Sequence, residues 1–157
     1  MEIKRRITRQ INVGGVKIGG NGPIVIQSMA KTTTKDVAAT VRQINSLKKS
    51  GCEIVRVAVK DMADAKAIRE IKKKIDLPLV ADIHFHYQLA LEAIKNNADK
   101  VRLNPGNIFE VNEIKEVVVL ARKHKIPIRV GLNSGSLKVS NSSIADSMVK
   151  SCLDYLK

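Results

Sequence analysis

From residue 23 onward, short apolar runs rich in β-branched residues alternate with longer segments of helical periodicity. The apolar runs predict strands at 23–29, 53–60, 77–85, 99–107 and 126–135. The periodic segments predict helices at 35–50, 61–75, 87–97, 108–125 and 142–157, with Thr34 as the N-cap of the first helix. Strands that alternate with helices at this spacing favour a parallel sheet with right-handed crossovers. The sequence therefore predicts an α/β fold of five β-α units in series.

The first 22 residues have a different pattern. Two short alternating stretches, ITRQINV and VKIGG, flank Gly14-Gly15, which predicts a small β-hairpin. We expect two parts in this chain: an N-terminal hairpin over 1–22 that closes the bottom of a barrel, and β-α units over 23–157.

The polar residues within the predicted strands share one face. Because strand side chains alternate, Arg102 and Asn104 lie opposite Val101 and Leu103. Both faces of an open doubly wound sheet pack on helices, so a polar face in every strand would be costly there. In a barrel, the inner face near the C-terminal mouth of the strands collects polar groups around a ligand. The pattern therefore favours a barrel.

Charge and composition narrow the class of partner. The 28 Lys and Arg outweigh 15 Asp and Glu, giving a net charge of +13, which predicts attraction to an anion. A nucleic-acid-binding module is one alternative, but aromatic residues are 3% of the chain and provide little base stacking. Cys52 and Cys152 match no zinc spacing and predict reduced thiols in a cytoplasmic protein. No apolar run is long enough to predict a membrane span.

Three arginines near strand ends predict a pocket for a dianion or a diphosphate, because guanidinium groups bind phosphate oxygens in pairs. The predicted ligands are Arg56, Arg102 and Arg129, with Asn104 and Asn133 as neutral donors. The alternative is that each arginine pairs with a core carboxylate, for which Asp82 is the clear candidate.

The segment DIHFH raises a second alternative. Asp82, His84 and His86 alternate along it and offer nitrogen and oxygen ligands for a metal ion. His86 falls at the predicted start of a helix, beyond the alternation of the strand. We therefore predict no metal site here and assign Asp82 and His84 to hydrogen bonding or proton transfer.

Five short motifs together resemble the hydroxymethylbutenyl diphosphate synthase family of the non-mevalonate (MEP) isoprenoid biosynthesis pathway. They are IQSM at 26–29, VRVAV at 55–59, ADIHF at 81–85, VRLNPGN at 101–107 and RVGLNSGSL at 129–137. The resemblance covers nearly the whole chain, with the motifs in the family's order.

The resemblance implies an oxidoreductase whose TIM barrel holds 2-C-methyl-D-erythritol 2,4-cyclodiphosphate. A separate C-terminal domain carries a 4Fe-4S iron-sulfur cluster, and two electrons from flavodoxin or ferredoxin open the ring to give 4-hydroxy-3-methylbut-2-enyl diphosphate. The complete enzyme is expected to be a homodimer. Carried over by motif, the expected substrate-binding residues are Arg56, Arg102, Asn104, Arg129, Asn133, Asp82, His84, Gln27 and Ser28.

The sequence also departs from the family pattern. A TIM barrel needs ~250 residues and eight strands, whereas five are predicted here. Neither cysteine matches a cluster ligand. We therefore expect the chain to be the N-terminal part of such an enzyme, to bind no cluster and to be inactive alone. A phosphate-binding barrel of the dihydropteroate synthase kind remains an alternative.

Overall fold

The computed structural model describes residues 6–108, 110–136 and 143–156, and within them the strands form one five-stranded parallel sheet and a separate hairpin. The sheet strands are β3 (Gln27–Met29), β4 (Ile54–Val59), β5 (Leu79–Ile83), β6 (Lys100–Leu103) and β7 (Ile128–Val130). Each strand pairs with the next one along the chain, in the order β3-β4-β5-β6-β7. A doubly wound sheet reverses its strand order at a switch point, and this sheet does not. The sequential order confirms the predicted barrel-like arrangement.

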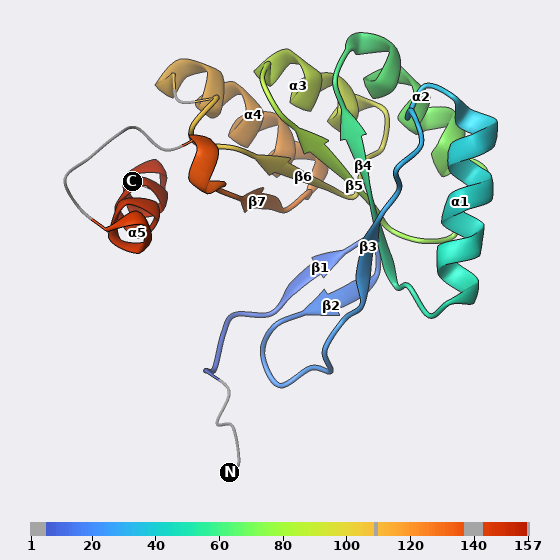
Figure 1. Ribbon diagram of the computed structural model, residues 1–157, viewed down its shortest axis with the longest axis horizontal. Coiled ribbons are helices and arrows are strands. Elements are labelled where there is room, and N and C mark those ends of the chain that lie inside the picture. Colours follow the sequence, from blue (N-terminus) through green and yellow to red (C-terminus); the bar gives the residue numbers. More distant parts are fainter. Residues whose placement is uncertain (1–5, 109, 137–142, 157) are drawn as a thin grey trace.

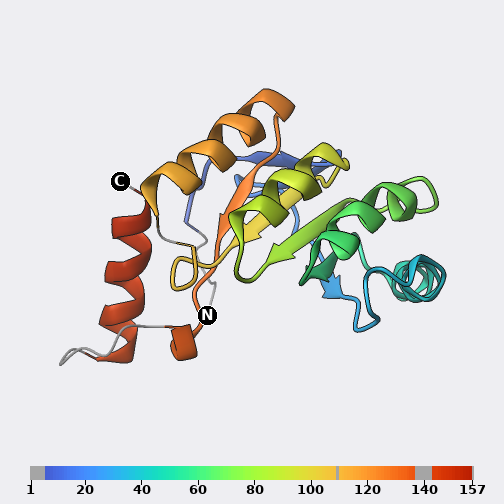
Figure 2. The ribbon, with the colours of Figure 1, turned by 90° about the horizontal axis from the view of Figure 1, so that it is seen from above.

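Four helices cover the outer face of the sheet in a row (Figures 1 and 2). They are α1 (Val37–Lys49), α2 (Met62–Lys72), α3 (Tyr87–Lys95) and α4 (Val111–His124). Aliphatic residues of β4, β5 and β6 pack against the inward sides of these helices and form the main core. No described helix is both long and apolar enough to cross a membrane.

The last helix stands apart from this row. After β7 the chain makes a 3₁₀ turn, η1 (Ser134–Ser136), and later forms α5 (Ile144–Tyr155). Figures 1 and 2 show α5 away from α1–α4, and none of its residues is buried. Residues 1–5, Phe109, Ser142 and Lys157, all within predicted elements, lie outside the described residues.

The predicted N-terminal hairpin is present as β1 (Ile11–Val13) paired antiparallel with β2 (Val16–Ile18). Its turn requires glycine, because φ is 55° at Gly14 and 97° at Gly15. Val13 packs with Ile54 and Val80 in a small apolar cluster. Ile54 and Val80 lie near the N-terminal ends of β4 and β5, so the hairpin contacts that end of the sheet. That it closes a complete barrel remains a prediction.

The start of α1 differs from the prediction. The N-cap is Asp36, whose side chain accepts a hydrogen bond from the Ala39 amide, and not Thr34. The Thr34 hydroxyl instead donates to the carbonyl oxygen of Ala58 at 2.6 Å. Thr34 therefore fastens the β3–α1 loop to β4, a long-range contact that local sequence does not reveal.

Candidate anion-binding site

The cross-strand register places the predicted site residues on the inner face of the sheet, opposite the helices. Arg56 pairs with Met29 of β3, Asp82 pairs with Arg102, and Arg102 pairs with Arg129. Paired residues of neighbouring strands point to the same face. The sheet therefore brings the arginines of three strands and one carboxylate together.

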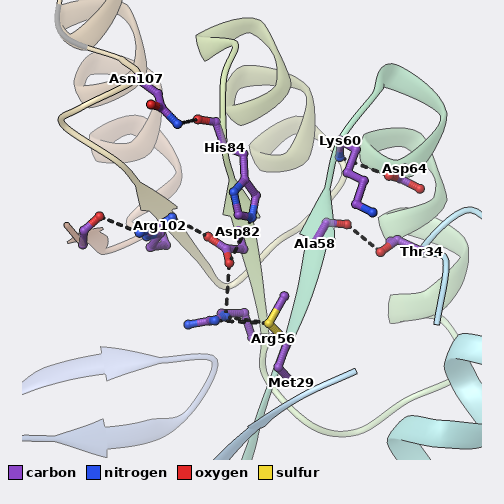
Figure 3. A network of polar contacts seen from close by, with 11 residues as sticks. Met29, Thr34, Arg56, Ala58, Lys60, Asp64, Asp82, His84, Arg102 and Asn107 are labelled. Carbon is purple, nitrogen blue, oxygen red and sulfur yellow. Dashed lines mark hydrogen bonds and ion pairs between the residues drawn. The ribbon is translucent and has the colours of Figure 1, made fainter. Parts of the chain in front are cut away.

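Asp82 lies at the centre of this group (Figure 3). Its Oδ2 is 3.3 Å from Nε of Arg56, and its Oδ1 is 3.2 Å from Nη1 of Arg102. Nε2 of His84 lies 3.5 Å from Oδ2. Asp82 is 2% exposed, so contacts with these partners replace the contacts with water that its carboxylate lacks. The alternative that core carboxylates pair with the arginines is thus confirmed for two of the three.

Arg102 is held on two sides. Besides its bond to Asp82, its Nη2 donates to the carbonyl oxygen of Gly131 at 2.6 Å. A Cβ at position 131 would lie 2.6 Å from Nε of Arg102. Glycine at this position therefore leaves the room that the Arg102 side chain occupies.

Besides Asp82, the guanidinium of Arg56 contacts the thioether sulfur of a methionine. Its Nε and Nη2 lie 3.2 and 3.1 Å from Sδ of Met29 on β3. The side chain is 26% exposed, so it is less enclosed than Arg102. Met29 and Asp82 orient Arg56 and leave part of it open to solvent.

The inner face also carries a lysine that the sequence analysis did not single out. Lys100 precedes Arg102 by two residues on β6 and is buried. Burial lowers the pKa of the Lys100 amine from its usual value, and the positive charges of Arg129 and Arg56 lower that pKa further. The strand alternation that places Arg102 on the inner face also places Lys100 there, so the sequence could have predicted this residue.

Arg129 is exposed, unlike Arg102 beside it. No hydrogen bond or ion pair joins its guanidinium to another residue in the described ranges. Arg129 pairs with Arg102, which is two residues from Lys100 on β6, so strand alternation places Arg129 and Lys100 on the same side of the sheet. Arg129 is therefore the arginine of this group that is most accessible to a ligand.

The turn after β6 connects the C-terminal end of β6 to the segment that follows β5. Oδ1 of Asn104 accepts from the amide of Gly106 at 3.2 Å, and the Asn104 carbonyl accepts from the amides of Asn107 and Ile108. Nδ2 of Asn107 donates to the carbonyl oxygen of His84 at 2.7 Å. Asn104 is 2% exposed. This turn fixes the end of β6 against the segment after β5, a role for Asn107 that its sequence position does not suggest.

The remaining predicted residues lie at the margins of the site. Asn133 is exposed and precedes η1. Gln27 is exposed and pairs with Ile54, which places it on the inner face. Ser28 pairs with Val55 of the helix-side core, so strand alternation turns it away from the arginines. The expectation that Ser28 contributes to the same pocket does not agree with this register.

The cysteines do not form a metal-binding group. Cys52 is buried near the start of β4, where its thiol donates to the carbonyl of Ile54, and Cys152 lies in α5. Within the described part of the chain, no cluster of three His, Cys, Asp or Glu side chains could hold a metal ion. The residues described here therefore do not fit the ligand set of an iron-sulfur cluster.

The family profile described as the GcpE TIM-barrel domain matches residues 8–157. The chain belongs to the GcpE family. Its five parallel strands and their helices are accordingly part of a TIM barrel. The functional proposal below is therefore based on the GcpE family. It is not based on the two alternatives, a barrel of the dihydropteroate synthase kind and a nucleic-acid-binding module.

Curated relatives are about half identical to this chain over the residues that align with it. The 4-hydroxy-3-methylbut-2-en-1-yl diphosphate synthase (flavodoxin) of Fusobacterium nucleatum is 54% identical over 151 residues, covering 96% of this chain and 42% of that protein. The protein of the same name from Shouchella clausii is 50% identical over 160 residues, covering 99% of this chain and 44% of its own length. The chain thus spans less than half the length of these relatives.

Solved structures of other proteins share the fold. A dipeptide epimerase from Enterococcus faecalis superposes with a TM-score of 0.55 at 20% identity, over 71% of this chain and 32% of the epimerase. A mandelate oxidase superposes with a TM-score of 0.53 at 10% identity, over 87% of this chain and 66% of the oxidase. At these identities the likeness concerns the fold of this GcpE family member and not its chemistry.

Proposed function

We propose that this chain is the substrate-binding part of a 4-hydroxy-3-methylbut-2-en-1-yl diphosphate synthase, and that its inner face binds the diphosphate of 2-C-methyl-D-erythritol 2,4-cyclodiphosphate. The observation that carries the proposal is the group of Arg56, Arg102 and Arg129 on one face of the sheet, where two of the three arginines share the single carboxylate of Asp82. This excess of positive charge favours an anion in the barrel mouth. The names of the GcpE relatives support the choice of substrate.

The three arginines have different tasks in this proposal. Arg102 is already bound to Asp82 and Gly131, so it supplies a fixed positive charge and positions its neighbours. Arg129 and the open part of Arg56 donate to phosphate oxygens. Asn104 and Asn133 add neutral donors near the turns, and His84 and Gln27 contact the rest of the substrate.

The reaction itself requires more than this chain. The resemblance implies that a 4Fe-4S cluster delivers two electrons while the ring opens and the C3 hydroxyl leaves as water. The described residues do not fit that cluster. In our proposal, the cluster ligands therefore come from another part of the complete enzyme, and this chain binds and orients the diphosphate but does not reduce it.

Partners and location follow from the same proposal. The relatives are named for flavodoxin, so flavodoxin is the proposed electron donor, with ferredoxin as the other expected carrier. We also propose a homodimer for the complete enzyme and a cytoplasmic location. The two free cysteines agree with a reducing compartment.

Titration calorimetry with the cyclodiphosphate tests the binding proposal on the chain and its variants. Arg56→Ala and Arg129→Ala each remove a charge-assisted contact worth about 1.5 to 3 kcal/mol, so each should weaken binding about tenfold or more. Arg102→Ala removes the fixed positive charge that positions them and should also weaken binding. Lys115→Ala is the matched control, because Lys115 is exposed on α4 in the outer layer.

Lys72 would be a poorer control, since its amine forms an ion pair with Asp99 at 2.6 Å. Equal losses of affinity in the Lys115 variant and the arginine variants would refute a specific pocket. Such a result would leave only the diffuse attraction of a basic protein for anions.

A further inference from the structure

Lys100 is a buried lysine for which the proposed function has so far given no task. It lies on the inner face at 7% exposure, two residues before Arg102 on β6. Neither a hydrogen bond nor an ion pair connects its amine to any residue within the described ranges. A lysine is rarely enclosed to this degree without a carboxylate beside it, and the Lys100 amine is not among the fully enclosed polar atoms of the described residues, so it still reaches solvent. The position of Lys100 therefore calls for an explanation.

The surroundings of Lys100 are cationic on one side and apolar on the other. The positive charges of Arg129 on β7 and Arg56 on β4 lower the pKa of the Lys100 amine. Arg102 lies two residues after Lys100 on β6. The paired residue on β5 is Val80, which belongs to the apolar cluster with Val13 of the hairpin. The neighbour of Lys100 on β5 therefore offers its amine no carboxylate.

In the described part of the chain, Asp82 is the carboxylate that forms ion pairs within this cationic group. It already contacts Arg56 and Arg102. One carboxylate cannot neutralise four cationic groups, so the group as a whole has a positive charge that an anion of two or three charges would balance.

We propose that Lys100 is a further anion-binding group of this pocket, which contacts the diphosphate from the floor of the barrel while the arginines hold it at the mouth. This inference rests on the proposed function, because it concerns the same site. It adds a residue that the five motifs do not assign to the ligand. The ligand class is a compact anion of at least two charges, such as a diphosphate.

Binding through Lys100 would be coupled to a proton. In the free pocket, burial and the neighbouring arginines lower the pKa of the Lys100 amine. A bound anion raises that pKa again, so binding takes up a proton at pH values between the free and bound pKa. Affinity is therefore full below the free-state pKa and falls as pH rises from the free-state to the bound-state pKa.

The test uses inorganic pyrophosphate as the probe and titration calorimetry as the measurement. Lys100→Met removes the charge and keeps the length of the side chain, and it should weaken binding about tenfold or more. Lys100→Arg keeps a charge that does not titrate, so it should retain most of the affinity. Lys115→Met is the matched control and should bind like the unmodified chain.

Proton uptake provides a second reading. Titrations in two buffers of different ionisation enthalpy, from about pH 8 to pH 10, give the number of protons bound with the ligand. The ionisation of pyrophosphate itself is common to all variants and cancels in the comparison. The unmodified chain should take up more protons than Lys100→Arg, a difference that a purely structural lysine would not produce.

The outcomes separate this inference from the proposed function. If the unmodified chain does not bind pyrophosphate, the anion site itself is wrong and both fall. If it binds while Lys100→Met matches Lys115→Met, the proposed function stands and the role of Lys100 is refuted. Circular dichroism checks the fold of Lys100→Met. If that variant is unfolded, equal proton uptake by Lys100→Arg and the unmodified chain still refutes the inference.

Discussion

At the scale of single residues, the site depends on the fit between Arg102 and Gly131. Gly131 accepts one hydrogen bond from Arg102 through its carbonyl and leaves room for the guanidinium through its missing side chain. Its backbone is not in the left-handed region, so only space demands a glycine here. A substitution of Gly131 should therefore move the Arg102 guanidinium and leave its charge on the protein.

We predict that Gly131→Ala weakens pyrophosphate binding about tenfold although the net charge is unchanged. The new Cβ would lie 2.6 Å from Nε of Arg102, so the guanidinium must leave its position between Asp82 and Gly131. A misplaced charge-assisted hydrogen bond forfeits about 1.5 kcal/mol or more. Titration calorimetry measures the change.

Gly135→Ala is the matched control for this prediction. A Cβ at position 135 meets no atom of the described residues within 4 Å, so affinity should be preserved. If both alanine variants bind as tightly as the unmodified chain, the position of Arg102 does not matter for binding, and its proposed role of positioning Arg56 and Arg129 is wrong.

At the scale of elements, Asp64 joins two loops at the C-terminal ends of the strands. It is the first acidic residue of α2, is 3% exposed, and accepts from the amides of Lys35 and Lys60 at 2.9 and 3.1 Å. One side chain thereby satisfies the backbone of the β3–α1 and β4–α2 loops (Figure 3 shows the bond to Lys60).

We predict that Asp64→Ala lowers the free energy of unfolding by about 1 to 3 kcal/mol, because two partly buried amides lose a charged acceptor. Urea unfolding followed by circular dichroism measures it. Asp76→Ala is the control, since Asp76 is exposed and its ion pair with Lys48 lies at the surface, where such pairs contribute little. Equal midpoints for the two variants would contradict the role of Asp64.

The elements were more predictable from sequence than the contacts between them. Hydrophobic periodicity was sufficient to predict that strands β3–β7 alternate with helices α1–α5 along the chain. The pair Gly14-Gly15 was sufficient to predict the hairpin. The cap of α1 was wrong, because Thr34 and Asp36 both suit an N-cap and only the tertiary bond to Ala58 distinguishes them. Local pattern does not record such long-range bonds.

The same distinction applies to the site. Strand alternation predicted that Arg56, Asp82 and Arg102 share a face, and the register confirms it. Alternation does not give the offset between neighbouring strands, so the contact between Arg56 and Met29 was not predictable. The tasks of these residues as ligands remain predictions until binding is measured.

At the scale of the whole molecule, β3 and β7 are the outer strands of the sheet, and no further strand pairs with them among the described residues. None of the residues of α5 is buried. Exposed apolar side chains gather on α5 and at its C-cap, with Ile144 and Leu156 each 66% exposed and Leu153 56% exposed. Open edges and apolar patches of this kind promote association between protein chains.

We therefore predict that this 157-residue chain self-associates as its concentration rises. Size-exclusion chromatography with light scattering measures the mass at several concentrations. Replacing Leu153 and Leu156 with Glu should shift the chain toward monomer, because it makes the exposed face of α5 polar. Lys150→Glu, which changes charge on the same helix without removing apolar surface, is the control. A chain that stays monomeric at all concentrations would contradict the prediction.

The hairpin has a consequence for the order in which the chain acquires its structure during synthesis. Each strand of the sheet pairs with the next one made, so pairing can follow the ribosome from β3 to β7. The hairpin is made before the strands of the sheet, but Val13 packs on Ile54 and Val80, which belong to β4 and β5. The apolar side of the hairpin can therefore dock only after two later strands have been made, so a segment synthesised before the sheet docks after part of the sheet has formed.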